Sequence, residues 1–286
     1  MTETELGCYL KERKALVEQA LNACLPPAHT EPRLVHEAMR YATLSGGKRL
    51  RPIFTLAIGE LGQAPADAFL DTACAIELAH TASLILDDLP CMDNAALRRG
   101  VPCTHVQFDK ATALLTTVSL LALAFELTAK NAAAWAPSSA AAVGLLARAV
   151  GTSGLVYGQH LDLCLTGQNP PIEALERVHH LKAGALFLAA IRIPALLLGL
   201  ADADMQRLEQ FGKNVGLAFQ ITDDLLDEEK TAEDAGKSTF ATHLGREGAQ
   251  AEVKQLIAQA IAALEPLGAP AEPLRCLAAF VGARKS

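Results

Sequence analysis

Two short acidic motifs carry the most definite chemistry in this sequence. Each contains three aspartates: Asp87, Asp88 and Asp93 in the first, and Asp223, Asp224 and Asp227 in the second. In the second motif the i, i+3 and i+4 spacings crowd like charges on one face of a helix, which favours a bound cation. Carboxylate oxygens with no nearby Cys or His pair suit Mg²⁺, which commonly bridges a few carboxylates to substrate phosphates. The motifs therefore predict a magnesium site for a phosphorylated substrate.

Both acidic motifs follow apolar stretches, so we expect them to close buried helices. Pro90 must end or kink the first of these helices, because proline has no N–H to donate to the preceding turn. One acidic cluster alone could equally be a solvated helix end. Two clusters in this setting favour a site, and we expect them to face one cavity from opposite walls.

Basic residues beside glycines or at predicted helix ends supply the complementary charge: Lys48, Arg51, Arg98, Arg99, Lys182 and Lys237. The break at 45–47 is followed by Lys48, Arg49 and Arg51, just before a helix that begins near Pro52. Helix starts attract anions, so this is an anion-binding arrangement. Arginine forks also bind phosphate oxygens in pairs. His80 lies two helical turns before Asp87 and is predicted to point into the same cavity, with a hydrogen-bonded core histidine as the alternative.

The composition predicts an all-α protein. Ala (53 residues) and Leu (46 residues) dominate, while aromatic residues make up only 5%, so helix-favouring side chains far outnumber strand-favouring ones. No long linker interrupts the chain, which predicts a single domain over residues 1–286. The longest predicted helices cover 66–88, 111–130, 138–166, 172–200 and 204–228.

Charge and cysteine content indicate which kinds of binding partner and which cellular compartment to expect. The net charge is −7 and no basic block is present, which argues against nucleic acid and for a small partner. Seven cysteines without a C-x-x-C pair indicate reduced thiols. The first residues are charged where a signal peptide is apolar, which predicts a cytoplasmic protein. The longest uncharged apolar run, 111–125, is shorter than the ~20 residues of a membrane span, so no span is expected.

The ordered motifs over about residues 34–244 resemble those of the all-trans short-chain prenyl diphosphate synthases. They are Ser-Gly-Gly-Lys-Arg-Leu-Arg-Pro from Ser45, the two aspartate motifs, Gly-Gln-His-Leu-Asp from Gly158, Lys-Ala-Gly from Lys182, and Gly-Lys-Ser-Thr from Gly236. The likeness is greatest to geranylgeranyl and farnesyl diphosphate synthases whose first aspartate motif has two extra residues.

The resemblance implies a helical bundle around a deep central cavity, a homodimer, and three Mg²⁺ ions. It also implies a reaction: an allylic diphosphate (dimethylallyl, geranyl or farnesyl) ionises, isopentenyl diphosphate attacks the cation, and a proton is lost.

By motif, the resemblance assigns roles to residues of this chain. Asp87, Asp93 and Asp223 would bind metal directly, with Asp88, Asp224 and Asp227 in support. Lys48, Arg51, His80 and Arg99 would hold isopentenyl diphosphate. Arg98, Lys182, Gln220 and Lys237 would hold the allylic diphosphate, and Phe219, Gln159 and Asp162 complete the substrate-binding set. Ala183 stands where the family usually has Thr, and the chain is shorter than usual after Asp227. These departures bear on the reaction rate and on the closing of the site more than on the class of reaction.

Two small residues suggest the product. At ~1.5 Å per residue, Ser83 and Ala82 lie about 6 and 7.5 Å below Asp87, where the family has the floor under the growing chain. An open floor favours geranylgeranyl diphosphate, with farnesyl diphosphate as the alternative.

Two other functions are alternatives to prenyl transfer. The first is a class I terpene cyclase, which would not need the second diphosphate site that Lys48, Arg51, Arg98 and Arg99 offer. The second is a non-catalytic subunit of a prenyl synthase, which would typically have lost its aspartates, whereas both motifs are intact here.

Overall fold

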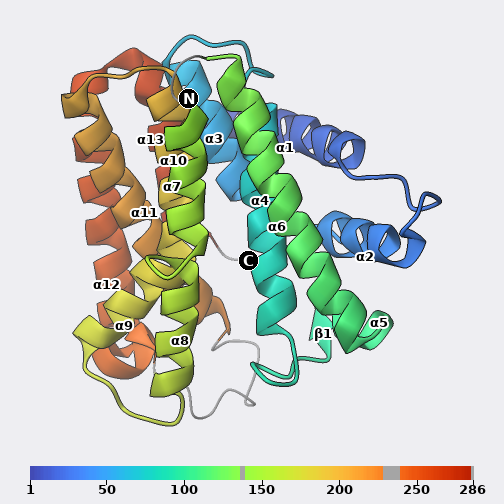
Figure 1. Cartoon of the computed structure of the whole chain (residues 1–286). Coiled ribbons are helices and arrows are strands. Elements are labelled where there is room, and N and C mark those ends of the chain that lie inside the picture. Colours follow the sequence, from blue (N-terminus) through green and yellow to red (C-terminus); the bar gives the residue numbers. More distant parts are fainter. Residues whose placement is uncertain (136–138, 228–238, 285–286) are drawn as a thin grey trace. The chain divides into compact units, whose positions relative to one another are not determined.

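The computed structural model describes residues 1–135, 139–227 and 239–284 (Figure 1). The described helices form two compact units, one of Gly7–Leu146 and the other of Met1–Leu6 with Ala147–Ser286. The all-α prediction is confirmed. Within the described ranges the only strands are β1 (Leu97–Arg98) and β2 (Val101–Pro102), which form a two-residue antiparallel ladder.

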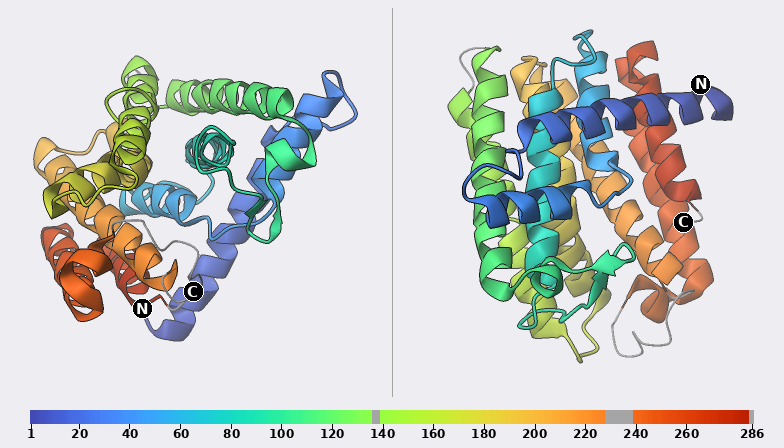
Figure 2. Two further views of the ribbon diagram at one scale, coloured as in Figure 1. Left: turned by 90° about the horizontal axis from the view of Figure 1, so that it is seen from below. Right: turned by 90° about the vertical axis from the view of Figure 1, so that its right-hand side faces the viewer.

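The unit of Gly7–Leu146 is built around one central helix, α4 (Leu70–Asp87), which packs along α6 (Lys110–Ala133) and against α3 (Leu50–Leu61) and α2 (Arg33–Leu44) (Figure 2). Because neighbours cover it on several sides, α4 is apolar around most of its circumference. The unit also contains most of α1 (Glu3–Cys24), the short α5 (Thr104–Gln107) and the first part of α7 (Ser139–Val150).

The second unit centres on α11 (Asp202–Asp227), which packs against α12 (Phe240–Ala263) and α10 (Ala185–Leu197). Its other elements are α8 (Leu155–Leu165), α9 (Ile172–His179), the π-helical turn η1 (His180–Gly184), the 3₁₀ turns η3 (Glu265–Leu267) and η4 (Ala269–Ala271), and α13 (Glu272–Ala283).

Two predicted helices are interrupted in the structure. The helix expected at 138–166 is two helices, α7 and α8, because glycines at both ends of the segment Gly151–Gly154 weaken the helix there. The helix expected at 172–200 contains the π turn η1, which holds Lys182. Pi turns inside helices are frequent at functional sites. The predicted stop at Pro90 is confirmed, since α4 ends at Asp87.

Three helical stretches are long and apolar enough to cross a membrane: Lys110–Ala133, Ala140–Leu165 and Ile172–Leu197. Sequence inspection underestimated them, because it counted only uncharged runs, whereas a spanning window tolerates a charge or two. In Ile172–Leu197, 61% of the most apolar window is buried inside the structure, so packing against other helices also accounts for its composition. The absence of a span stays a prediction.

Candidate active site

The first aspartate motif closes the carboxyl end of α4. Asp87 is the last helical residue, Asp88 caps the helix, and both side chains are buried. The chain then folds back: the N–H of Asp93 donates to the Asp87 carbonyl (2.9 Å) and the N–H of Ala95 to the Asp88 carbonyl (3.2 Å). These bonds satisfy carbonyls that the helix end leaves open. The longer loop therefore brings the exposed Asp93 next to Asp87.

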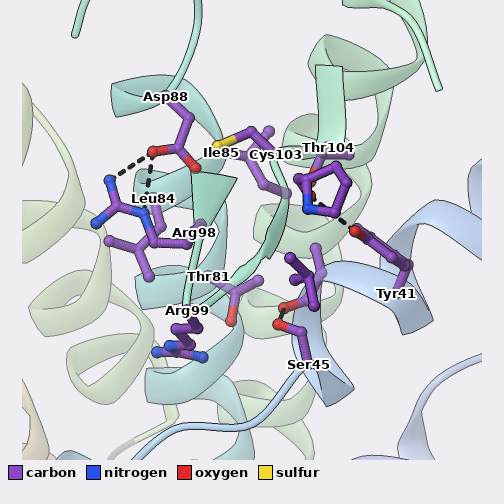
Figure 3. Close-up of a pocket in the computed structure, with 13 residues that line it drawn as sticks. Tyr41, Ser45, Thr81, Leu84, Ile85, Asp88, Arg98, Arg99, Cys103 and Thr104 are labelled. Carbon is purple, nitrogen blue, oxygen red and sulfur yellow. Dashed lines mark hydrogen bonds and ion pairs between the residues drawn. The ribbon is translucent and has the colours of Figure 1, made fainter. Parts of the chain in front are cut away.

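Arg98 returns to this motif through the β1–β2 hairpin. Its Nε and Nη2 donate to Oδ1 of Asp88 at 3.0 and 2.5 Å, and the Asp88 side chain is 4% exposed (Figure 3). Burial, and then hydrogen bonding to Asp88, raise the pKa of the neighbouring Cys103 to about 12, so this thiol stays protonated. Arg98, which is predicted to hold the allylic diphosphate, thus pairs with Asp88, which is a predicted metal ligand.

The glycine break before α3 carries the loop that is predicted to bind an anion. Gly46 and Gly47 have φ of 98° and 134°. The Arg99 guanidinium lies directly over Gly47, where a Cβ would stand 2.9 Å from its Cζ, and Nη1 of Arg99 donates to the Gly46 carbonyl. Only glycine fits there. Arg51, in the first turn of α3, places Nη1 3.4 Å from His80 Nε2, and Lys48 is exposed in the same loop.

His80 is surrounded by arginines. Its enclosed position, followed by the charges of Arg51, Arg99, Arg49 and Arg98, lowers the pKa of His80 well below its ordinary value. A neutral imidazole can accept a hydrogen bond from Arg51 at Nε2 and donate one from Nδ1. The structure thus brings together His80, Arg51 and Arg99, as predicted for one diphosphate site.

Arg49 organises this loop. The sequence groups it with Lys48 and Arg51 as an anion-binding cation, and that expectation is wrong, because its guanidinium is taken up by partners inside the unit. Its backbone is left-handed (φ 54°) and its side chain is fully buried. The guanidinium donates to Glu77 Oε1 (2.6 Å), Glu18 Oε1 (2.9 Å) and the Thr43 carbonyl (2.6 Å). Glu77, a glutamate in the middle of an apolar helix, was the available signal, because a buried carboxylate needs a cation partner.

A small recess next to Asp88 is lined by Thr81, Leu84 and Ile85 of α4, with Tyr41 and Ser45 contributed from α2 and its end (Figure 3). The two residues expected to set the product length do not line it. Ala82 is completely buried, and the Ser83 hydroxyl donates to the His80 carbonyl (2.8 Å). Their role under the growing chain stays a prediction.

The second aspartate motif lies in the last turns of α11. Gln220 Nε2 donates to Asp224 Oδ1 (2.9 Å), and His179 Nε2 stands 3.6 Å from Asp224 Oδ2. Arg284, the last residue described, donates to Asp223 Oδ1. Neither His179 nor Arg284 was predicted, because each reaches the motif only through tertiary packing. Asp227 ends α11, but its side chain is not among those described. Lys237 lies outside the described residues.

Lys182 meets its predicted neighbours across a close contact between α8 and η1. A Cβ on Gly158 would lie 2.4 Å from the Lys182 backbone nitrogen, so only glycine allows the approach. Lys182 Nζ then reaches Asp162 Oδ2 at 2.7 Å, and Gln159 is buried beside them. In the same unit Phe219 packs on Phe187 with ring centroids 5.1 Å apart.

The donors fit magnesium. Buried Asp87 and Asp88 sit at the negative end of α4, an arrangement that favours a cation. Across the part of the chain that is described, no three His, Cys, Asp or Glu side chains are preassembled as a metal cage. Mg²⁺ needs none, because it binds through one or two carboxylates together with substrate phosphates.

Comparison with known proteins gives a consistent class. Residues 32–243 match the polyprenyl synthetase family. A chloroplastic geranylgeranyl pyrophosphate synthase of Capsicum annuum is 39% identical over 96% of this chain and 78% of its own length. A geranylgeranyl diphosphate synthase of Cyanophora paradoxa is 44% identical over 83% of this chain and 79% of its own.

Solved structures agree. An FPP/GFPP synthase from Zymomonas mobilis, in an apo crystal structure, superposes with a TM-score of 0.91 at 36% identity, covering 99% of this chain and 100% of that one. A geranyltransferase from Legionella pneumophila gives a TM-score of 0.83 at 34% identity, covering 98% and 96%.

Fold and site together define a prenyltransferase of the isoprenoid synthase type. The chain belongs to the polyprenyl synthetase family. It is therefore a short-chain prenyltransferase, and its family binds isoprenyl diphosphates and generally uses Mg²⁺.

Proposed function

We propose that this enzyme condenses isopentenyl diphosphate with an allylic diphosphate to give geranylgeranyl diphosphate and inorganic diphosphate. The observation that carries the proposal lies within one unit: Arg51 and Arg99 gather around a neutral His80, and Asp87 and Asp88 end the same helix two turns further on. A fixed group of guanidinium forks beside metal-binding carboxylates suits two diphosphates.

In this proposal Lys48, Arg51 and Arg99 bind the diphosphate of isopentenyl diphosphate, and His80 orients the Arg51 fork. Asp87, Asp93 and Asp223 would be the ligands of three Mg²⁺ ions in the presence of the allylic diphosphate, with Asp88, Asp224 and Asp227 in support. When bound, the metal neutralises charge on the departing diphosphate. Lys182, Arg98, Gln220 and Lys237 bind the same leaving group through its oxygens.

Relatives named for geranylgeranyl diphosphate support that product length. So do the small side chains of Ala82 and Ser83, one to two turns before Asp87. Farnesyl diphosphate is the second candidate, favoured by the FPP/GFPP synthase that superposes best among the structures described above.

We also propose that the enzyme is a cytoplasmic, single-domain homodimer without a membrane span. All seven cysteines are free thiols, as in a reducing compartment. Leu114, Leu115 and Val118 of α6 are 48%, 56% and 65% exposed, and such an apolar helix face suits a second copy of the chain.

Product analysis tests the proposal. The purified chain with Mg²⁺ and isopentenyl diphosphate is given dimethylallyl, geranyl or farnesyl diphosphate, and the products are separated by chain length. We expect a C20 diphosphate from every primer and none without isopentenyl diphosphate. Accumulation of a C15 product would indicate the farnesyl alternative, and a cyclised hydrocarbon made without isopentenyl diphosphate would refute prenyl transfer.

A further inference from the structure

The end of the described chain reaches the second aspartate motif. α13 ends at Ala283, and Arg284 continues in an extended conformation (φ −59°, ψ 139°). Its Nη2 donates to Asp223 Oδ1, and its guanidinium carbon lies 4.3 Å from the centroid of the Phe219 ring. The Arg284 side chain is only 1% exposed. A residue outside every recognised motif is thus the ion-pair partner of a predicted metal ligand.

The hydrogen bonding of Arg284 is incomplete, which is unfavourable for the stability of the fold. Arginine has five N–H donors, and a buried donor without a partner is unfavourable. Nε and Nη1 of Arg284 are buried and have no hydrogen-bond partner among the described residues. The ring of Phe219 and the carboxylate of Asp223 hold the charge in place, but they leave part of the guanidinium unsatisfied.

The electrostatics of the motif explain why a cation is needed there. Asp223 and Asp224 are consecutive carboxylates, and Asp227 follows one turn later. Asp224 already accepts a hydrogen bond from Gln220, whereas Asp223 pairs with the charged Arg284. The Asp223 side chain is 33% exposed, so it remains accessible while Arg284 is bound.

We propose that Arg284 is a placeholder cation: it pairs with Asp223 while no magnesium is bound, and magnesium diphosphate displaces it. The proposal rests on the proposed function, which makes Asp223 a metal ligand. Two positive charges on one carboxylate oppose each other, so the ion pair must weaken as the metal binds. Arg284 therefore stabilises the metal-free enzyme and raises the magnesium concentration that the site requires.

Binding of Mg²⁺ with inorganic diphosphate, measured by calorimetry, tests this without turnover. In Arg284→Gln we expect the dissociation constant to fall by about fivefold to tenfold, the size of one lost opposing interaction near a surface. In EDTA the same variant should melt at a lower temperature than the wild type. Arg284→Lys keeps the charge and should bind magnesium diphosphate as the wild type does.

Arg275→Gln is the matched control. Arg275 lies on α13 and pairs with Glu272 at 3.0 Å, away from the aspartate motif, so its loss should leave magnesium diphosphate affinity unchanged. Truncation after Ala283 provides a second variant if Arg284→Gln folds poorly, and it should tighten binding in the same way.

Unchanged or weaker binding in Arg284→Gln and in the truncated chain would overturn the placeholder role. The wild type separates this failure from failure of the proposed function. If the wild type binds magnesium diphosphate and forms prenyl product while the variants do not bind tighter, only the role of Arg284 is wrong. If the wild type neither binds nor reacts, the proposed function fails and the placeholder role fails with it.

Discussion

At the scale of single residues, the arginines of the Gly7–Leu146 unit differ in what their guanidinium groups contact. Arg49 is fully buried and joins two glutamates to a backbone carbonyl, whereas Arg51 lies against His80 and Arg99 donates to the Gly46 carbonyl. Truncating one member of a buried ion-pair network leaves the others uncompensated. We therefore expect Arg49 to be a positioning residue for Lys48 in the loop and for Arg51 in the first turn of α3.

Replacing Arg49 with lysine should change substrate binding selectively. Lysine keeps the charge but cannot reach Glu18, Glu77 and the Thr43 carbonyl with one fork. We expect KM for isopentenyl diphosphate to rise about tenfold, equivalent to ~1.4 kcal/mol, while KM for the allylic substrate changes little. Steady-state kinetics with each substrate varied in turn provide the measurement.

Arg33→Lys is the control for this change, since Arg33 forms only an exposed pair with Glu31. An equal change in both KM values, or no change, would show that Arg49 does not position the proposed site for isopentenyl diphosphate.

His80 should make the fold less stable in mild acid. Its folded pKa lies below the unfolded value, so below about pH 6.5 the unfolded chain takes up a proton that the folded chain refuses. Stability is therefore unaffected above that pH and falls below it, by no more than about 1.4 kcal/mol per pH unit. Desolvation of the enclosed ring, and then the charges of Arg51, Arg99, Arg49 and Arg98, lower its pKa and keep it neutral.

Urea unfolding at pH 7 and pH 5 measures the effect. His80→Gln should lose less stability between the two pH values than the wild type, with His29→Gln, at an exposed position, as the control. Equal losses in the wild type and His80→Gln would rule out a neutral folded His80.

At the scale of elements, apolar periodicity and proline positions predicted α4, α6 and α11 with small errors at the ends. The interruptions were beyond that reasoning. A helical chain tolerates a glycine or a π turn according to what packs beside it, and the approach of Gly158 to Lys182 exists only in the folded unit. The same limit applies to the candidate site. The spacing of the aspartates and of the glycine-flanked cations can be read from the sequence, but the contacts of His179, Arg49 and Arg284 arise only in the tertiary structure.

The size of the side chain at position 82 of α4 should control the chain length of the product. Ala82→Tyr places a phenol ring about 7.5 Å below Asp87, and we expect the main product to shorten from C20 to C15 or less. Ser83→Ala, which keeps the floor small, is the matched control and should still give C20. Chromatography of the dephosphorylated products measures the change, with circular dichroism to verify folding because Ala82 is completely buried. A C20 product from folded Ala82→Tyr would place the floor elsewhere.

At the scale of the whole molecule, the exposed apolar face of α6 predicts self-association. Val118→Glu puts a charge on the most exposed of the three large apolar residues of this face. We expect the dissociation constant of the dimer to rise by at least about tenfold. Val106→Glu, at a 52% exposed position on α5, should not affect it. Analytical ultracentrifugation decides: a wild type that is monomeric at micromolar concentration, or a Val118→Glu dimer as tight as the wild type, argues against this interface.

The central claim is that both aspartate motifs serve one magnesium-dependent ionisation. Kinetic constants of Asp87→Asn, Asp223→Asn and the double variant test it. Asp71→Asn and Asp204→Asn, in the first turns of the same two helices, are the controls and should have little effect. Residues that act as a unit are strongly non-additive.

We expect each single change to lower kcat by about a thousandfold and the double change to lower it by no more than about another tenfold. Losses that multiply, so that the double variant is about a millionfold slower, or an Asp223→Asn enzyme with normal turnover, would contradict the claim.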